Sequence, residues 1–351
     1  MFKALQDELR YIAQNRVYLA LITLLPAISL LFFYSFFRNV SIESLPIAVV
    51  DYDNSSTSRS LVEMIDATAY ARVEYSTQNT VEAQELIRSG QVYAAVVIPH
   101  NFESSVLRAE PSSVALYNNG TNISTNGFIE KDIQTVVTTL NAAVSIKNGE
   151  TIAEILPINI EQHILFNPEL DYAAYLAPCF MPMMVMIFAL LGTIMATTER
   201  KTKGVKQLIG RCLPTTFAMI IFAMAMLITL FRTLQIPMNG SAWVVIVATI
   251  LLVVDYQAIG LLLSTITRNR HLAISLGGGY SVLAFTFSGL TFPTMAMFSV
   301  LRIASHIFPF TYYMKIMVEQ ALRGAPIYVS LPKIGYMILF AAVPILINKR
   351  L

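Results

Sequence analysis

The chain has 351 residues, of which 55% are hydrophobic and 13% are charged, and its mean hydropathy is +0.60. Soluble globular proteins carry about 25% charged residues, so a single water-soluble core cannot hold this much apolar surface and part of it must face lipid. The formal net charge is only +2, and the basic residues form short clusters beside apolar runs, which argues against nucleic-acid binding.

The amino-terminal part of the chain is predicted to be an interfacial helix followed by a membrane anchor. In residues 1–16, apolar residues recur at helical spacing opposite the charged ones: Phe2, Leu5, Leu9 and Ile12. This pattern predicts an amphipathic cytoplasmic helix at the membrane surface. The same helix could serve as a binding surface for a partner protein. Residues 17–37 form an apolar run of the length that a spanning helix needs, about 20 residues. The run is too long for a signal-peptide core and no small-residue cleavage site follows it, so we expect a retained anchor.

Residues 38–171 are mostly polar and are predicted to form an α/β domain outside the membrane. Within them, β-branched runs alternate with helix caps and helical patterns. The expected strands cover residues 46–52, 72–76, 92–98 and 114–117. The expected helices cover residues 58–67, the segment between Asn79 and Gly90, residues 101–109 and residues 123–146. This order predicts helices packed on a sheet, but it names no ligand.

Residues 172–351 contain five more apolar runs, each predicted to cross the membrane. The runs cover residues 172–198, 213–231, 242–267, 272–292 and 334–347. Residues 293–332 are too apolar for an ordinary loop, yet charged side chains interrupt them, so we predict a re-entrant pair of helices at the outer leaflet. The alternative is one extra span. The expected fold is therefore an α-helical membrane protein with six spanning helices, one before and five after an inserted extracytoplasmic α/β domain.

Lysine and arginine near the membrane predict the orientation, because they collect on the cytoplasmic side. The connection over residues 199–212 is rich in basic residues. With this connection inside, both termini lie in the cytoplasm and residues 38–171 lie outside. We therefore expect a multi-pass protein embedded in the lipid of the cytoplasmic membrane.

The sequence contains no signature of an enzyme or of a metal site. It lacks the phosphate-binding pattern Gly-x-x-x-x-Gly-Lys-[Ser/Thr], and it lacks His-Glu-x-x-His and Cys-x-x-Cys. Its four histidines are scattered. We therefore predict no catalytic residue, no metal and no cofactor on this chain. Cys179 and Cys212 lie near opposite ends of neighbouring predicted helices, which disfavours a disulfide between them.

Asp255 lies in the middle of the predicted span over residues 242–267. A charge at this depth is costly, so the side chain should face the helix bundle or water, or be protonated. Two interpretations remain open: contact with a polar substrate or its pathway, and a hydrogen bond to a neighbouring helix that fixes packing. In the next span, Gly277, Gly278 and Gly279 favour close approach between helices rather than ligand binding.

Several segments, taken in order along nearly the whole chain, resemble one family of transport proteins. The family's opening strand, acidic turn and helix are matched by PIAVVDYDNSSTSRSLVEMI, and its next strand, proline and helix start by AAVVIPHNFESSVL. Its Asn-Pro segment before the second span is matched by ILFNPELDYAAYLAP, and its re-entrant region by FSGLTFP with SHIFPFTYYMKIMVEQALRG. Its coupling loop, Glu-Arg-x-x-Gly-Thr-x-x-x-Leu, is matched by ERKTKGVKQL. The layout resembles the ABC-2 permeases, which are membrane subunits of ATP-binding cassette exporters, and within them the subgroup with a large outer domain that includes bacterial multidrug-export permeases.

The resemblance implies a permease subunit of the bacterial inner membrane without an ATPase site of its own. ATP and Mg²⁺ would bind a partner ATP-binding cassette subunit, and the other implied partners are a second permease copy or homologue and a periplasmic adaptor. The residues that would face the ATPase are Glu199, Arg200, Gly204, Gln207 and Leu208. The chain departs from the family pattern at Val205, where the family has threonine, and it lacks a clear proline-containing linker after Leu208.

The implied function is ATP-driven export of a small molecule, drug or lipid-like substrate across the membrane. The alternative is a membrane-anchored scaffold or receptor of a secretion or surface-assembly system, with a ligand-binding outer domain. Dependence of transport on an ATPase distinguishes these two functions.

Overall fold

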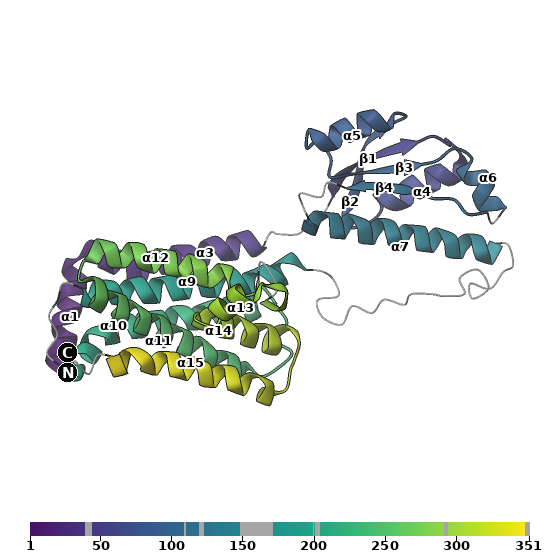
Figure 1. Cartoon of the computed structure of the whole chain (residues 1–351). Coiled ribbons are helices and arrows are strands. Elements are labelled where there is room, and N and C mark those ends of the chain that lie inside the picture. The colour runs from purple at the N-terminus through teal and green to yellow at the C-terminus, as the bar shows by residue number, and fades with distance from the viewer. Residues whose placement is uncertain are drawn as a thin grey trace. The chain divides into compact units, whose positions relative to one another are not determined.

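The computed structural model describes residues 1–38, 44–108, 110–118, 123–147, 171–198, 200, 204–290 and 294–347. The chain divides into two compact units (Figure 1). The helical unit consists of Met1–Val40 and Leu165–Leu351, and the mixed unit consists of Ser41–Ile164. The first helices of the chain therefore belong to the same compact unit as the last ones.

The mixed unit is built on a four-stranded sheet with the order β2-β1-β3-β4. Its strands are β1 (Leu45–Asp51), β2 (Ala71–Thr77), β3 (Ala94–Ile98) and β4 (Ala115–Asn118). Strand β1 runs parallel to β2 and β3, and β4 runs antiparallel to β3. The helices of this unit are α4 (Ser56–Asp66), α5 (Thr80–Arg88), α6 (Phe102–Leu107) and α7 (Ile123–Lys147).

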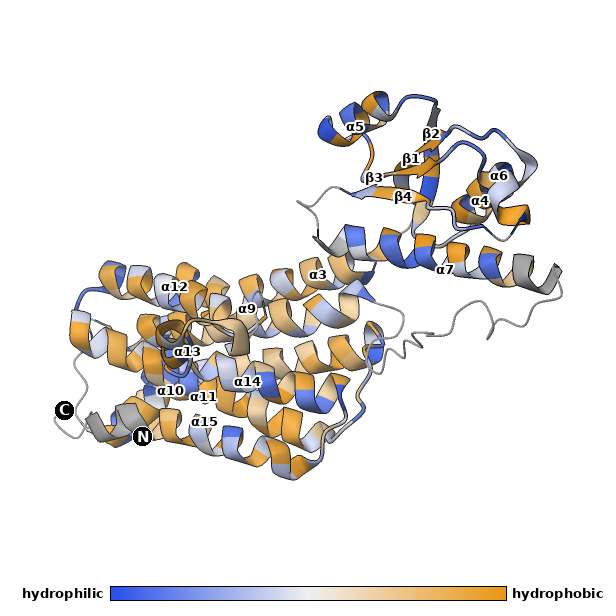
Figure 2. Cartoon of the chain, turned by 45° about the vertical axis from the view of Figure 1, so that its right-hand side comes forward, coloured by the Kyte–Doolittle hydropathy of each residue, from blue (hydrophilic) through white to orange (hydrophobic). Residues whose placement is uncertain are grey.

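Helices cover both faces of this sheet because its central strands are apolar on both sides. Ala48 and Val50 of β1 pack with Ala83 of α5 on one face. Ile47, at an alternate position of β1, is fully buried and points to the other face, where α4 and α7 lie (Figure 1). Hydrophobic and hydrophilic residues alternate along α7 (Figure 2), as expected for a helix with one side on a sheet.

The strands and helices expected in this unit are all present, with small differences at their ends. Strand β3 begins at Ala94 rather than at residue 92. Helix α4 begins at Ser56 rather than at residue 58, because the Ser55 side chain accepts a hydrogen bond from the Ser58 amide in a capping box. The location of this unit outside the membrane stays a prediction.

The helical unit begins with an amino-terminal series of helices and continues with a bundle. The amino-terminal helices are α1 (Phe2–Gln14), α2 (Arg16–Leu19), η1 (Ala20–Leu24) and α3 (Leu25–Arg38). The long helices of the bundle are α9 (Tyr172–Thr197), α10 (Val205–Ile228), α11 (Ala242–Thr267), α12 (Arg270–Thr286) and α15 (Ile327–Ile347). A π-helical turn, η2 (Thr229–Thr233), directly follows α10. The short helices between α12 and α15 are η3 (Thr294–Ala296), α13 (Ser299–Ser305), α14 (Pro309–Met317) and η4 (Val318–Leu322).

Among the described residues, four helices are long and apolar enough to cross a membrane. They are Arg16–Arg38, Tyr172–Thr197, Val205–Thr233 and Ala242–Thr267. Hydrophobic residues dominate the helices of this unit (Figure 2). Helix α12 has 17 residues, and the described apolar part of α15 is Ile327–Ala342, so both fall short of this length. A mostly helical membrane protein with a small mixed sheet is therefore confirmed, whereas the count of six spans stays a prediction.

Three helix boundaries differ from those expected. Helix α10 begins at Val205, so much of the predicted coupling loop over residues 199–212 is the first part of a helix. Helix α12 ends at Thr286 rather than at residue 292. Helix α15 begins at Ile327 rather than at residue 334, which shortens the predicted re-entrant segment over residues 293–332. Hydropathy marks the apolar part of a helix, whereas the backbone hydrogen bonds of that helix continue through polar residues on either side.

Helix α11 is the centre of the bundle and packs against α9, α10, α12, α14 and α15. Small residues allow this packing. A Cβ atom added to Gly260 of α11 would lie 2.7 Å from the carbonyl oxygen of Leu190 in α9. A Cβ atom added to Gly277 of α12 would clash with the Leu190 side chain. The expected close approach is therefore found at Gly277, whereas Gly278 and Gly279 border open space.

Candidate functional site

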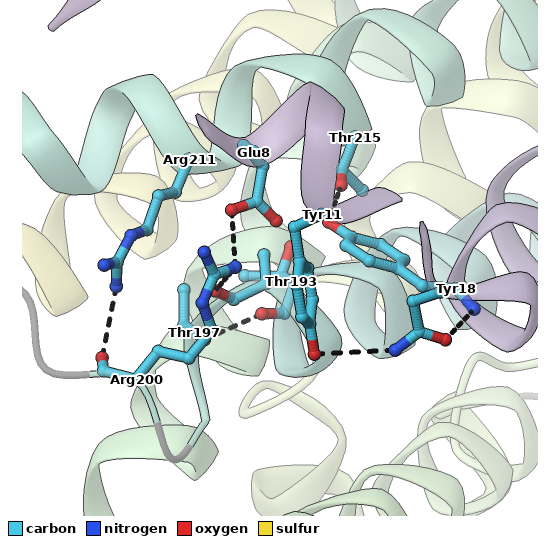
Figure 3. Close-up of polar contacts among 10 residues, drawn as sticks. Glu8, Tyr11, Tyr18, Thr193, Thr197, Arg200, Arg211 and Thr215 are labelled. Carbon is cyan, nitrogen blue, oxygen red and sulfur yellow. Dashed lines mark hydrogen bonds and ion pairs between the residues drawn. The ribbon is translucent and has the colours of Figure 1, made fainter. Parts of the chain in front are cut away.

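Helix α1 packs against α10 through a face that contains a buried carboxylate (Figure 3). Ala4, Glu8 and Ile12 are spaced four residues apart, so they share one side of the helix, and all three are buried. Phe2 and Leu9 of the predicted apolar face are instead 70% and 52% exposed. An amphipathic helix is present, and its packed side shares Ile12 with the predicted apolar stripe. Contact of that stripe with the membrane surface or with a partner stays a prediction.

The Glu8 carboxylate forms an ion pair with Arg200, which lies in the connection between α9 and α10. Nη1 of Arg200 donates to Oε2 of Glu8 at 2.5 Å and to the carbonyl oxygen of Ala196 at 3.3 Å. The Glu8 side chain is fully buried, and the Arg200 side chain is 21% exposed. Because both groups are shielded from water, this charge-assisted bond is stronger than a surface ion pair. The pair therefore ties α1 to the basic connection that follows α9.

Two further contacts hold Arg200 in place (Figure 3). Its guanidinium lies over the ring of Tyr11, 4.2 Å from the ring centroid, a distance at which the ring attracts a cation. Nη1 of Arg211 in α10 donates a hydrogen bond to the Arg200 carbonyl oxygen at 3.2 Å. Arg200 therefore connects α1, the end of α9 and the start of α10.

Helices α1 and α10 also approach each other closely at a glycine. A Cβ atom added to Gly210 would lie 2.7 Å from the carbonyl oxygen of Met1 and 3.0 Å from the Cβ atom of Ala4. A larger side chain here would push the two helices apart. Further along α10, the hydroxyl groups of Tyr18 and Thr215 form a buried hydrogen bond of 2.7 Å. The amino-terminal helices are thus joined to α10 at two levels, in addition to the ion pair with the connection before it.

Burial raises the pKa of the Glu8 carboxyl above its ordinary value of 4.5, and the neighbouring Arg200 opposes this increase. The carboxylate therefore depends on the arginine to keep its charge inside the protein. Removing one partner of such a pair leaves an uncompensated buried charge, which is strongly destabilising. The pair therefore favours arrangements in which α1 stays in contact with the connection that follows α9.

Of the residues predicted to face an ATPase, Arg200 is the one found among the contacts with Glu8 and Tyr11. Gly204 has a φ of +86°, directly precedes α10 and is exposed, with open space where a Cβ atom would be. Gln207 and Leu208 are half-buried in the first turn of α10. Glu199 lies outside the described residues. Contact of these residues with an ATPase stays a prediction.

The sequence reasoning missed Glu8, although one signal was available. Glu8 follows Ala4 by four residues and precedes Ile12 by four, so a helix places it between a small and an apolar side chain. Its neighbour Asp7 is exposed. An acid on an otherwise uncharged stripe of a helix indicates a buried partner of opposite charge.

Asp255, the remaining predicted residue, lies inside the helix bundle. Its side chain is fully buried. Within the described parts of the chain, neither carboxylate oxygen has a hydrogen-bond partner. The hydrogen bond to a neighbouring helix that the packing interpretation requires is therefore not found there.

The apolar helices and the small mixed sheet define a membrane protein, and its amino-terminal helix is tied by an ion pair to a basic connection. The chain belongs to the ABC-2 family, because the family model described as "ABC-2 family transporter protein" matches residues 16–348. Members are membrane components of transporters, they associate with an ATP-binding cassette ATPase, and that separate subunit hydrolyses the ATP. The family resemblance drawn from the sequence is thus confirmed.

The relatives that the chain matches include the "Probable multidrug ABC transporter permease YbhS" of Escherichia coli strain K12 and of Escherichia coli O157:H7. Each is 23% identical to this chain over 319 residues, which cover 87% of this chain and 84% of the relative. No solved structure matches the chain.

Proposed function

We propose that this chain is the transmembrane subunit of an exporter that a separate ATPase, with bound ATP and Mg²⁺, drives from the cytoplasmic side. The buried Glu8–Arg200 pair carries the proposal, because it ties the amino-terminal helix to the connection expected to meet the ATPase. In the proposed orientation, both termini and residues 199–212 lie in the cytoplasm and residues 38–171 lie outside the bacterial inner membrane. The proposed substrate is a small molecule, drug or lipid-like molecule, and the word multidrug in the name of the relative supports a drug.

The contacts around Arg200 provide a route for movement through the subunit. The exposed start of α10, at Gly204, is the place where the ATPase would push. The ion pair, the close approach at Gly210 and the hydrogen bond between Tyr18 and Thr215 make α1 and α2 follow α10. Helix α2 continues through η1 into α3, and together they cover the predicted first span over residues 17–37. A displacement of the connection therefore reaches the first span as well as α9 and α10.

A second copy of this chain, or a homologue, completes the proposed pathway. The two subunits alternate between two arrangements, and the ATPase drives the change because it binds one arrangement better than the other. Uncovered apolar surface on α12 supports such pairing: Leu276 and Val282 are 47% and 60% exposed. A periplasmic adaptor is a further proposed partner of the mixed unit.

Aspartate substitutions at the start of α10 test the coupling role. The full chain is co-expressed with its ATP-binding cassette subunit, and co-purification and ATP-dependent dye transport into inside-out vesicles are measured. We expect Gly204→Asp and Leu208→Asp to lose both co-purification with the ATPase and dye transport, while membrane insertion is unchanged. Gly90→Asp is the matched control, because Gly90 also has a positive φ (+75°) and open surroundings but belongs to the mixed unit. Wild-type transport by both α10 variants would reject the proposed function.

A further inference from the structure

Asp255 lies at the middle of α11, with about 18–20 Å of helix on either side at 1.5 Å per residue. In α9, in α11 and in α12 beyond His271, it is the only aspartate, glutamate, lysine or arginine of the sequence. On α15, Lys333 is already paired with Glu319 at 2.6 Å, and Lys315 of α14 belongs to the same group of charges. Among the described residues, α9, α11, α12, α14 and α15 therefore offer Asp255 no free cation.

Two polar groups near Asp255, the Tyr280 hydroxyl and the Gln257 Oε1 atom, bond to other partners. Tyr280 of α12 is an electrostatic neighbour of Asp255, yet its hydroxyl donates to the carbonyl oxygen of Ile307 at 3.2 Å. The side chain of Gln257 is turned to α10, where its Oε1 accepts a hydrogen bond from Thr216 at 2.9 Å. Because the described residues supply no donor to either carboxylate oxygen, helix packing does not explain the acid.

Tyr256 and Tyr280 are neighbours of this acid, and Phe308 packs against Tyr280; these three rings are called the aromatic wall. The ring centroids of Tyr256 and Tyr280 are 6.1 Å apart, and those of Tyr280 and Phe308 are 5.0 Å apart. The face of an aromatic ring attracts a cation, and quaternary ammonium groups are recognised in this way. A carboxylate adds a full opposite charge. An isolated acid beside aromatic rings in an apolar bundle is therefore suited to a lipophilic cation and not to an anion.

We propose that Asp255 binds the positive charge of a lipophilic cation, such as a protonated or quaternary amine, whose apolar part lies against the aromatic wall. This inference rests on the proposed export function, since the cation would be the cargo. Tyr280 is half-buried, and a Cβ atom added to Gly278 or Gly279 just before it meets nothing. The site thus adjoins a side of α12 that the rest of the bundle leaves uncovered.

Equilibrium binding of tetraphenylphosphonium to the full chain in lipid nanodiscs, without any ATPase, tests the proposal. We expect the wild type to bind this cation and Asp255→Asn to bind it at least about tenfold more weakly, since the amide keeps the shape and loses the charge. Asp255→Glu should stay within about threefold of the wild type. Asp7→Asn, which removes an exposed acid from α1, controls for net charge and should bind as the wild type does.

Substitutions of Tyr280 provide a second test that does not depend on the folding of the Asp255 variants. Tyr280→Leu removes the ring and should weaken binding about fivefold, whereas Tyr280→Phe keeps the ring and should bind as the wild type does. Wild-type affinity in Asp255→Asn would overturn the proposal, and so would the absence of binding by the wild type. Neither result bears on coupling, because the assay contains no ATPase and the coupling variants lie at the start of α10.

Discussion

Replacing Arg200 with methionine removes the cation that holds the buried Glu8 carboxylate, while a long side chain still covers the ring of Tyr11. An uncompensated buried carboxylate takes up a proton when protonation costs less than remaining ionised. For a carboxyl with an ordinary pKa of 4.5, protonation at pH 7 costs about 3.4 kcal/mol, at about 1.36 kcal/mol for each pH unit above the pKa. This value is the upper limit of the cost of the unpaired carboxylate in Arg200→Met.

The expected destabilisation is somewhat smaller than this limit. The Arg200 side chain is 21% exposed, so water reaches the site, and we expect about 2–3 kcal/mol, below the 3–5 kcal/mol typical of broken buried pairs. This free energy weakens the packing of α1 on α10 and raises the population of detached α1 about 30- to 150-fold. Arg10→Met is the matched control, because Arg10 is an exposed cation on the same helix and its loss should change nothing.

Hydrogen–deuterium exchange at the amides of α1 (Phe2–Gln14) measures the detached population, with the full chain in nanodiscs. At pH 7, exchange in Arg200→Met should be about 30- to 150-fold faster than in Arg10→Met. The double variant with Glu8→Gln should return close to the wild type, since a neutral amide leaves no unpaired charge behind. Exchange in Arg200→Met equal to that in Arg10→Met would refute the reasoning.

The size of this effect should depend on pH, because burial raises the pKa of Glu8. A carboxyl with a raised pKa in the packed state favours packing below its ordinary pKa, and this contribution is lost as the pH rises through the raised value. At pH 5, the limit for Arg200→Met is therefore about 0.7 kcal/mol, or about threefold in exchange. An equal effect at pH 5 and pH 7, each relative to Arg10→Met, would show that the buried acid is not its source.

Two glycine substitutions should change the stability of the protein in opposite directions. Gly210→Ala should cost about 1–3 kcal/mol of helix packing, because the new Cβ atom would lie 2.7 Å from the carbonyl oxygen of Met1, and faster exchange in α1 measures this loss. The new Cβ atom of Gly335→Ala in α15 meets open space, so this variant should stabilise the chain by about 0.5–1 kcal/mol, measured as a higher Tm. A stabilising effect of both substitutions would contradict the close approach of α1 and α10 at Gly210. Ser55→Ala removes the capping box of α4 and should destabilise that helix by about 1 kcal/mol; unchanged exchange across Ser56–Asp66 would show that the cap contributes little.

Local patterns in the sequence were sufficient for the class of protein and for the elements of the mixed unit. Hydropathy located the apolar helices, because about 20 consecutive apolar residues have few stable positions outside a membrane. Caps and turn residues located the ends of the helices in the mixed unit, since a cap such as Asn79 satisfies amides of the adjacent turn. These signals act over a few residues, so they can be read without knowing the fold.

Contacts between distant residues were decided only by the tertiary structure. The helical pattern of α1 showed an apolar stripe but did not show that Glu8 is buried, because its partner Arg200 lies 192 residues away along the chain. The sequence also placed Asp255 in a spanning helix, but the absence of a partner among the described residues became visible once its neighbours were known. Charge pairing and burial depend on three-dimensional neighbours, which no local periodicity specifies.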